Sequence, residues 1–237
     1  MNWKLITASL LVALPVVADE FQAANQLYDA GKFAEAAAAY EKIEPKTAHV
    51  YYNLGSACFR QDKLGLAVLN YERARRLAPR DPDILANLKF AQQKLGVDEV
   101  NTPPRAVQRF VHSVTDSRTL AEWSAYELAG LWLIALAVGA CVYFPKLRSG
   151  LLVVGVVGIT LLAVSVFALS NRMITGVLTA GTEARFAPLP DSTVHFRLVE
   201  GTKVVVREDR GQWLFVERAD GQQGWIKTEV LGRITPM

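Results

Sequence analysis

Two long apolar runs stand next to each other in the middle of this chain of 237 residues. The first covers Leu128–Phe144 and the second covers Leu151–Leu169, and neither contains a charged residue. A helix of about 20 apolar residues is long enough to cross a lipid bilayer. Only residues 145–150 separate the two runs, so the sequence predicts a transmembrane hairpin. Because a hairpin returns the chain to its starting side, we expect the segments before and after it in one compartment.

The N-terminus predicts which compartment this is. Lys4 supplies a positive charge, Leu5–Val17 an apolar stretch and Ala18 the end of a small-residue cleavage site, which together form the pattern of a secretory signal peptide. An uncleaved anchor is the alternative, and it would export the following segment as well. Lys146 and Arg148 then lie in a cytoplasmic turn, in agreement with the positive-inside rule. Both soluble segments are therefore expected outside the cytoplasm.

These patterns divide the chain into seven segments. The predicted boundaries are a signal peptide at 1–18, a helical repeat domain with a closing helix at 19–96, a linker with an amphipathic juxtamembrane helix at 97–119, a first transmembrane helix at 120–144, a cytoplasmic turn at 145–150, a second transmembrane helix at 151–170 and a small β domain at 171–237. The first transmembrane helix is expected to begin near Leu120, because Thr119 and Glu122 have the spacing of a capping box.

Small residues in the apolar runs indicate where the two helices could approach each other. Ala135 and Gly139, or Gly155 and Gly158, would allow close packing. Glu127, at the outer end of the first run, is expected at the level of the lipid headgroups.

The charge balance excludes one class of partner. Residues 19–100 carry 11 Lys and Arg against 12 Asp and Glu, and residues 171–237 carry 9 against 8. Neither segment has the basic surplus of a nucleic-acid-binding domain, so we expect no nucleic-acid partner. Cys58 and Cys141 fall in a helical pattern and in an apolar run, and both are expected to be small buried side chains.

The segment before the hairpin contains an internal repeat. Ala36–Lys42 is echoed by Ala67–Arg73, and Asn53–Gly55 is echoed 34 residues later by Asn87–Lys89. A period near 34 with small residues at helix crossings resembles the tetratricopeptide repeat, a pair of antiparallel helices, over roughly residues 21–95. One pair cannot bury its apolar face alone, so neighbouring pairs are expected to stack.

The repeat pattern assigns roles to further side chains. Small residues are expected where helix backbones approach, and large ones between the helices: Ala24, Ala36, Gly55 and Ala67, then Leu27, Tyr40, Leu54 and Tyr71. Asp81, Pro82 and Asp83 predict the start of a closing helix over Ile84–Leu95. Four arginines near the end of the second repeat are expected to form a solvated helix surface, and a site for an acidic partner is the alternative: Arg73, Arg75, Arg76 and Arg80.

The resemblance to tetratricopeptide arrays implies a groove lined by the first helix of each repeat. The implied lining positions are Phe21, Asn25 and Tyr28, then His49, Tyr52, Ser56 and Phe59, then Asp83, Ala86 and Phe90. Aromatic side chains there suit an extended or helical peptide of a protein partner. The alternative is that the aromatic side chains pack against the neighbouring repeat or the membrane-proximal segment. Related arrays that hold a C-terminal carboxylate use lysines on this face, and this chain has none at the matching positions.

After Gly176 the pattern changes to short strands. Val204–Val206, Trp213–Val216 and Gly224–Ile226 are rich in β-branched and aromatic residues, and Asp220-Gly221 is a hairpin signal. About five such strands predict a small all-β barrel. The order and spacing of these motifs resemble the bacterial SH3 domain, with one departure: an apolar stretch, Phe186–Pro190, stands where that family has a more polar turn.

The SH3 resemblance implies binding of peptidoglycan or peptides. Trp213 and Trp225 are then the candidate surface residues, and the alternative is that one or both tryptophans pack in the core. No catalytic motif is present, and His49, His112 and His195 fall in three different segments. We therefore expect a protein that is not an enzyme and that has no metal site and no cofactor.

The order of the modules is more specific than any one of them. A signal peptide, a short tetratricopeptide array, a two-helix anchor and an SH3-like tail together resemble BatE-type proteins of the Bacteroides aerotolerance group. The stretch Asp81–Phe90 and the Gly224-Trp225 turn carry this resemblance best. It implies a two-pass protein of the bacterial inner membrane, with periplasmic soluble domains, that contacts von Willebrand A-domain membrane proteins and a MoxR-type ATPase in oxygen or stress tolerance.

Two main hypotheses follow. In the first, the chain is an adaptor anchored in membrane lipid, whose repeat domain binds a protein partner. In the second, the SH3-like domain binds peptidoglycan and the repeats are secondary. A role in the assembly of secreted or respiratory proteins is a third, less favoured class.

Overall fold

The computed structural model describes residues 19–97, 118–144, 146, 148–170 and 174–234. The described chain divides into two compact units. One unit combines the segment before the hairpin with the segment after it, and the other is the hairpin itself. The predicted signal peptide and the amphipathic helix of the linker lie outside the described residues.

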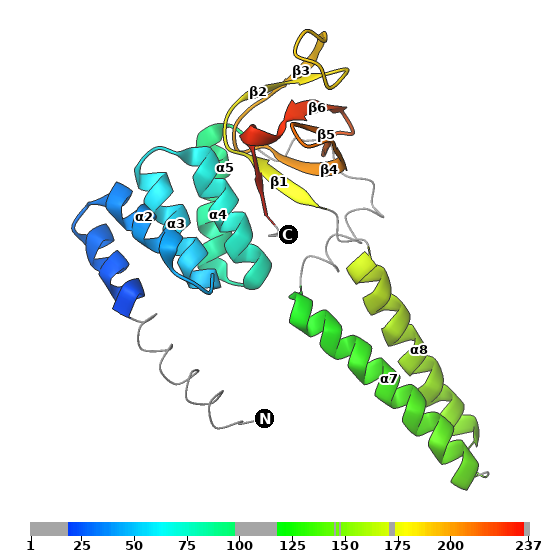
Figure 1. Cartoon of the computed structure of the whole chain (residues 1–237). Helices are drawn as coiled ribbons and strands as arrows, with labels where there is room; N and C mark the ends of the chain where they lie inside the picture. The colour runs from blue at the N-terminus through cyan, green and yellow to red at the C-terminus, as the bar shows by residue number, and fades with distance from the viewer. Residues whose placement is uncertain (1–18, 98–117, 145, 147, 171–173, 235–237) are drawn as a thin grey trace, which may run out of the picture. The chain divides into compact units, whose positions relative to one another are not determined.

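The N-terminal part of the first unit is entirely helical (Figure 1). Residues 19–29 are helical, and four further helices follow in the described chain: α2 (Phe33–Lys42), α3 (Ala48–Arg60), α4 (Leu64–Leu77) and α5 (Pro82–Leu95). Each helix packs against its neighbour in sequence, as expected of stacked helix pairs. Of the small residues predicted at helix crossings, Ala24, Ala36 and Ala67 are completely buried; of the large ones predicted between helices, Tyr40 and Tyr71 are nearly so, whereas Leu27 is partly buried.

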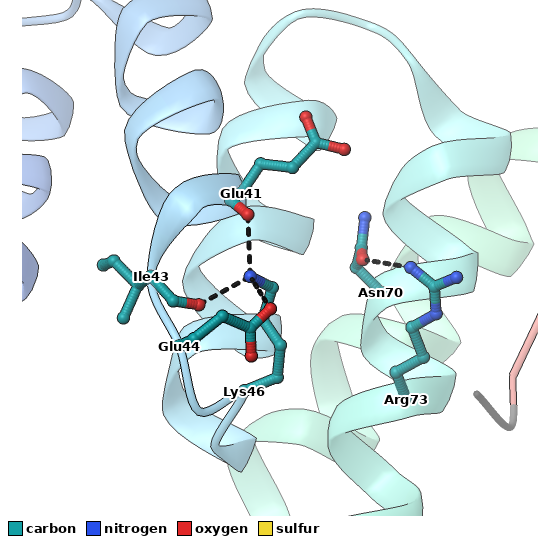
Figure 2. A network of polar contacts seen from close by, with 6 residues as sticks. All are labelled: Glu41, Ile43, Glu44, Lys46, Asn70 and Arg73. Atoms are coloured by element: carbon teal, nitrogen blue, oxygen red, sulfur yellow. Dashed lines mark hydrogen bonds and ion pairs between the residues drawn. The ribbon is translucent and has the colours of Figure 1, made fainter. Parts of the chain in front are cut away.

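Specific side chains fix the helix ends. Asp81 is the N-cap of α5, where its carboxylate accepts hydrogen bonds from the backbone N–H groups of Asp83 and Ile84. At the end of α2, the ammonium group of Lys46 donates to the carbonyl oxygens of Glu41 and Ile43 at 2.7 and 2.6 Å (Figure 2). These bonds occupy carbonyl groups that a helix C-terminus leaves without partners. The short link between the two helix pairs is thus held to the first pair.

The C-terminal part of the first unit is an antiparallel sheet. Its strands are β1 (Thr175–Leu178), β2 (Thr182–Arg185), β3 (Val194–Leu198), β4 (Lys203–Asp209), β5 (Trp213–Arg218), β6 (Gln223–Lys227) and β7 (Leu231–Arg233), with a short 3-10 turn, η2 (Thr228–Val230), before the last. The strand order is β3-β2-β6-β5-β4-β1-β7. Leu178, Leu214, Val216 and Ile226 are fully buried at its centre.

The β5–β6 hairpin turns where the sequence predicted. Gly221 has a φ of 86°, and the backbone N–H of Arg218 donates to the carbonyl of Gln222 at 2.9 Å. The described sheet has seven strands, however, and not about five. The two short strands β1 and β7 contain Gly176 and Gly232, and they lack the runs of β-branched or aromatic residues that mark β4 and β5.

Strands β1 and β7 pack on helix α4 and join the two parts of the first unit (Figure 1). Val177 from β1 and Ile234 after β7 belong to the same buried cluster as Val68 and Leu69 of α4. Gly232 lies so close to Leu69 that a Cβ atom added to Gly232 would overlap the Leu69 side chain. The helical and β parts therefore share one hydrophobic core.

Two polar contacts cross the same boundary. The guanidinium of Arg73 donates from Nε and Nη2 to the carbonyl oxygen of Arg233, at 3.1 and 2.9 Å. Glu72, whose side chain is 5% exposed, accepts from Arg75 at 2.8 Å and lies 3.5 Å from the ammonium of Lys203 on β4. The expectation that the arginines form a solvated surface is therefore wrong for Arg73, because the β part covers it.

The buried carboxylate of Glu72 remains charged because its cationic neighbours outweigh its burial. Burial alone raises the pKa of Glu72, whereas the charges of Lys203 and Arg75 lower it, and the net pKa lies below the ordinary value of 4.5. Burial also lowers the pKa of Arg73, which nevertheless keeps its hydrogen bonds to the β part.

The second unit is a pair of antiparallel helices, α7 (Leu120–Tyr143) and α8 (Arg148–Ser170). Both are long and apolar enough to cross a membrane, over Leu120–Cys141 and Gly150–Phe167. Helix α7 begins at the predicted residue, and both bonds of the capping box between Thr119 and Glu122 are formed.

The two helices of the hairpin are in close contact at a pair of glycines, Gly130 and Gly158. A Cβ atom at Gly130 would lie 2.9 Å from the carbonyl oxygen of Gly158, and one at Gly158 would lie 2.9 Å from that of Gly130. Gly158 was among the predicted contact residues. Gly139 was predicted too, but a Cβ atom at Gly139 would have no neighbouring atom within 4 Å. The contact depends on which residues of the two antiparallel helices lie opposite each other. The spacing of small residues within one helix does not show this.

We predict that Glu72→Gln lowers the free energy of unfolding by about 2 kcal/mol at pH 7, because the substitution leaves Lys203 and Arg75 without their anionic partner. The folded-state pKa of Glu72 is depressed, so its contribution is present above about pH 4.5 and is lost as the pH falls through the folded-state value. Acid should therefore destabilise the wild type more than the variant. Chemical unfolding of the full chain in detergent, followed by circular dichroism at pH 7 and at low pH, tests both points.

Glu35→Gln is the matched control, because that carboxylate is exposed and forms only a loose pair with Lys32 at 3.6 Å. An equal loss of stability in the two variants would contradict the proposed role of Glu72.

Candidate functional site

The predicted groove positions lie on three helices of the first unit. Residues 21, 25 and 28 are on the first helix, 49, 52, 56 and 59 are on α3, and 83, 86 and 90 are on α5. None of these ten side chains is buried. Hydrogen bonds connect adjacent helices at this level: Asn53 of α3 donates to Asn25, and Asn87 of α5 donates to Tyr52. We call the surface they share the binding face.

Carboxamide groups form a row across the binding face. Asn25 Oδ1 accepts from the hydroxyl of Tyr40 at 2.6 Å and from Nδ2 of Asn53 at 3.1 Å. Asn87 Nδ2 donates to the hydroxyl of Tyr52 at 2.6 Å. Asn87 is not among the residues that the sequence predicts for this site. The sequence feature that could have identified Asn87 is the internal repeat, because Asn53-Leu54-Gly55 and Asn87-Leu88-Lys89 occupy equivalent positions in it.

Tyrosine hydroxyls support this row from beneath. Burial raises the pKa of Tyr40 and of Tyr71 to about 12, so both hydroxyls remain protonated. Burial, with a contribution from the charge of Asp83, also raises the pKa of Tyr52. Ser56 shares a 3.1 Å hydrogen bond with Tyr71. These contacts hold α3 against its neighbours and keep the amide groups in place.

One end of the binding face is aromatic. The rings of Phe59 and Phe90 lie 5.5 Å apart, and Phe90 is 57% exposed. The ammonium of Lys94 lies 5.1 Å from the centre of the Phe59 ring and forms a 2.7 Å ion pair with Asp62. An exposed ring beside a fixed cation can receive an apolar side chain.

The remaining predicted residues have more limited roles in the fold. Phe21 packs against Tyr40 with ring centres 5.9 Å apart, and Tyr28 packs edge-on against Phe33 at 5.2 Å. These two rings contribute to packing within the first helix pair. His49 and Asp83 are exposed near the N-termini of α3 and α5, and neither side chain makes a hydrogen bond or ion pair in the described chain.

On the β part, the two predicted tryptophans differ. Trp225 is 7% exposed, and the Arg210 guanidinium lies 4.7 Å from the centre of its ring on a surface that Phe215 also contacts. Trp213 is half-buried. Among the described Phe, Tyr and Trp residues of the β part, the most exposed is Phe186, directly after β2, at 61%; its ring stacks on His195 with ring centres 4.2 Å apart. The sequence feature that pointed to this residue was the apolar stretch Phe186–Pro190, where the SH3 family has a more polar turn.

Cys58 is buried, as predicted, and burial raises the pKa of its thiol to about 11, which makes it unreactive at neutral pH. Within the described residues, no three His, Cys, Asp or Glu side chains gather as metal ligands. The chemistry that the binding face offers is therefore hydrogen bonding by amides and hydroxyls together with aromatic contact.

No protein-family model matches the chain, and no curated protein matches it at a significant level.

We predict that Phe90→Ala changes the free energy of unfolding by less than about 0.5 kcal/mol, because more than half of the ring is already exposed. Tyr71→Ala, by contrast, should cost about 3–5 kcal/mol, since it removes a ring that is 2% exposed. Thermal and chemical unfolding of the full chain in detergent measure both values. A large loss for Phe90→Ala would mean that this ring serves packing and is not a free surface.

Proposed function

We propose that this chain is a membrane-anchored scaffold that is not an enzyme. Its helical part is a short tetratricopeptide array that binds a segment of a protein partner on the binding face, and its β part is an SH3-like barrel. The observation that carries the proposal is the shared core of the helical and β parts, which precede and follow the two apolar helices in sequence.

This core supports a hairpin topology. Val177 and Ile234 can pack with Val68 and Leu69 of α4 only if both parts fold in the same compartment. An even number of membrane crossings must then lie between them, and α7 and α8 supply two. The signal-peptide pattern and the positive charges at Lys146 and Arg148 favour the periplasmic side of an inner membrane.

The same core favours the binding face as the site of partner contact. The β part packs mainly on α4, the second helix of its pair. The predicted lining residues are on the first helix of each pair and on α5, and Phe90 among them is largely exposed. By resemblance to BatE-type proteins, the proposed partners are von Willebrand A-domain membrane proteins and a MoxR-type ATPase system, in a complex that serves oxygen or stress tolerance.

Binding of peptidoglycan by the β part is the second candidate. The exposed stack of Phe186 on His195 favours it, because an aromatic surface suits sugar rings. The coverage of Trp225 by Arg210 counts against the tryptophan site that the sequence suggested.

The topology can be tested with a reporter enzyme that is active only outside the cytoplasm. We predict activity when it is inserted at Gly96 and when it is fused after Met237, because the two parts share one core. A truncated chain with the reporter fused after Lys146 should be inactive, since only one crossing then precedes it. Opposite results for the Gly96 and Met237 fusions would contradict the topology.

The partner site can be tested by cross-linking in cells followed by purification of the full chain. We predict that Phe90→Ala and Phe59→Ala reduce recovery of partners several-fold, because they remove the exposed aromatic end of the binding face. Phe186→Ala is the matched control on the β part. Retention on purified peptidoglycan that Phe186→Ala abolishes and Phe90→Ala leaves intact would favour the second candidate.

A further inference from the structure

We infer that the junction of helix α4 with the β part makes stable folding of the helical part depend on complete insertion of the membrane hairpin. The inference rests on the hairpin topology of the proposed function. The helical part precedes α7 and the β part follows α8, so the β part reaches α4 only after both helices have crossed. The junction thus acts as a checkpoint, because a chain with an incomplete hairpin leaves α4 uncovered.

Helix α4 is buried on almost all sides. Its buried positions are Leu64, Gly65, Ala67, Val68, Leu69, Asn70, Tyr71, Glu72 and Ala74. A helix at the surface of a helical array keeps a polar stripe exposed along its length, and this stretch of α4 does not. Helices α3 and α5 pack on α4, and strands β1 and β7 pack on it as well (Figure 1). The β part therefore supplies one side of the environment that buries this helix.

The side of α4 that meets the β part is suited to close contact and not to water. A Cβ atom at Gly65 would lie 2.9 Å from the carbonyl oxygen of Leu178, and one at Gly232 would lie 2.2 Å from Cδ2 of Leu69. Leu69 is 3% exposed in the folded chain, and burial of such a side chain is a main source of stability. Loss of the β part would return this apolar surface to solvent.

The β part also supports α5, which is the last described helix before the hairpin. Gly201, in the turn between β3 and β4, has a φ of 76°, and a Cβ atom there would lie 2.3 Å from Cδ1 of Leu95. The end of α5 therefore packs directly on the backbone of this turn. Both helices that close the helical part are thus in contact with a segment that the chain supplies only after α8.

The binding face depends on the same helix. Tyr71 of α4 shares a 3.1 Å hydrogen bond with Ser56, and a Cβ atom at Gly55 would lie 2.9 Å from the Tyr71 ring. Tyr52 packs on Tyr71 with ring centres 5.8 Å apart. A displaced α4 would therefore disturb α3, which carries the central part of the binding face. The checkpoint would restrict partner binding to chains whose hairpin is complete.

The order of synthesis gives the checkpoint time to act. The helical part is exported first, and the chain that follows Val97 takes on the order of 10 s to synthesise at about 5–20 residues per second. During this interval α4 has its helical neighbours and lacks the β part. A chain in which α8 fails to cross stays in that state.

The test compares two altered chains with the wild type in bacterial cells. In the first, residues 151–170 are deleted, so that α7 alone crosses and the β part stays in the cytoplasm. In the second, the same residues are replaced by an equally long run of leucine and alanine, which restores the crossing without the native sequence of α8. A reporter fused after Met237 shows on which side of the membrane the β part lies.

Protease added to spheroplasts then probes the helical part, which is followed with an antibody against residues 19–97. We expect cleavage at least about tenfold faster in the deletion chain than in the wild type, because cleavage follows the population of opened molecules. The replacement chain should resist as the wild type does.

Three results would contradict the inference. An inactive reporter with a helical part as resistant as that of the wild type, in the deletion chain, would overturn the inference and leave the proposed topology standing. A replacement chain that is cleaved as fast as the deletion chain, although its reporter is active, would do the same. An active reporter in the deletion chain would overturn the inference together with the topology.

A point variant tests the junction while the hairpin stays intact. Gly232→Leu forces a side chain against Leu69 and should speed cleavage several-fold in the wild-type chain. It should have no further effect in the deletion chain, where the β part is already separated from α4. Gly181→Leu is the matched control, because the nearest neighbour of a Cβ atom there is the carbonyl oxygen of Leu198 at 3.7 Å. An equal effect of Gly232→Leu in both chains would overturn the inference.

Discussion

The contact of β1 and β7 with helix α4 is the constraint on which the arrangement of this chain depends. It joins segments that two membrane-length helices separate in the sequence, and it places Val177 and Ile234 in the core of the helical part. Without the β part, the apolar side chains of α4 that face it would be exposed to solvent. Helix α5 packs on α4 as well. The β part thus stabilises the helical part by covering apolar surface that the helices alone leave exposed.

Local features of the fold could be predicted because their causes are local. The small residues Ala36 and Ala67 recur with the period of the helix pairs, the N-cap Asp81 precedes Pro82, and Thr119 stands three residues before Glu122. The junction of the two parts could not be predicted in the same way. Glu72 with Lys203, and Arg73 with Arg233, are more than 130 residues apart, and no spacing rule connects such pairs. The strands that make this junction are also short and contain glycine, so they lack the periodic signal that identified β4–β6.

The candidate site, too, could be predicted from the sequence only in part. Family resemblance predicted which helix faces are accessible, and the structure leaves Tyr52, Phe59 and Phe90 at least partly exposed there. Resemblance did not identify Asn87, because the equivalence of Asn53 and Asn87 matters only once Asn25 and Tyr52 are seen to bond to them. On the β part, Trp225 illustrates the opposite case. Its type and position suggested a ligand surface, yet Arg210 from the β4–β5 loop lies over the ring, which no local pattern indicates.

The shared core also restricts movement between the helical and β parts. Close contacts such as Gly232 against Leu69, with the buried ion pair of Glu72, oppose sliding of the β part on α4. A ligand on the binding face and a ligand on the β part would therefore be held at a fixed separation, and not on a flexible tether. Such rigidity favours simultaneous binding of two sites that match this separation and excludes those that do not, because the linker entropy that would accommodate a mismatch is absent. In the proposed scaffold, the junction would thus limit which pairs of ligands can bind at the same time.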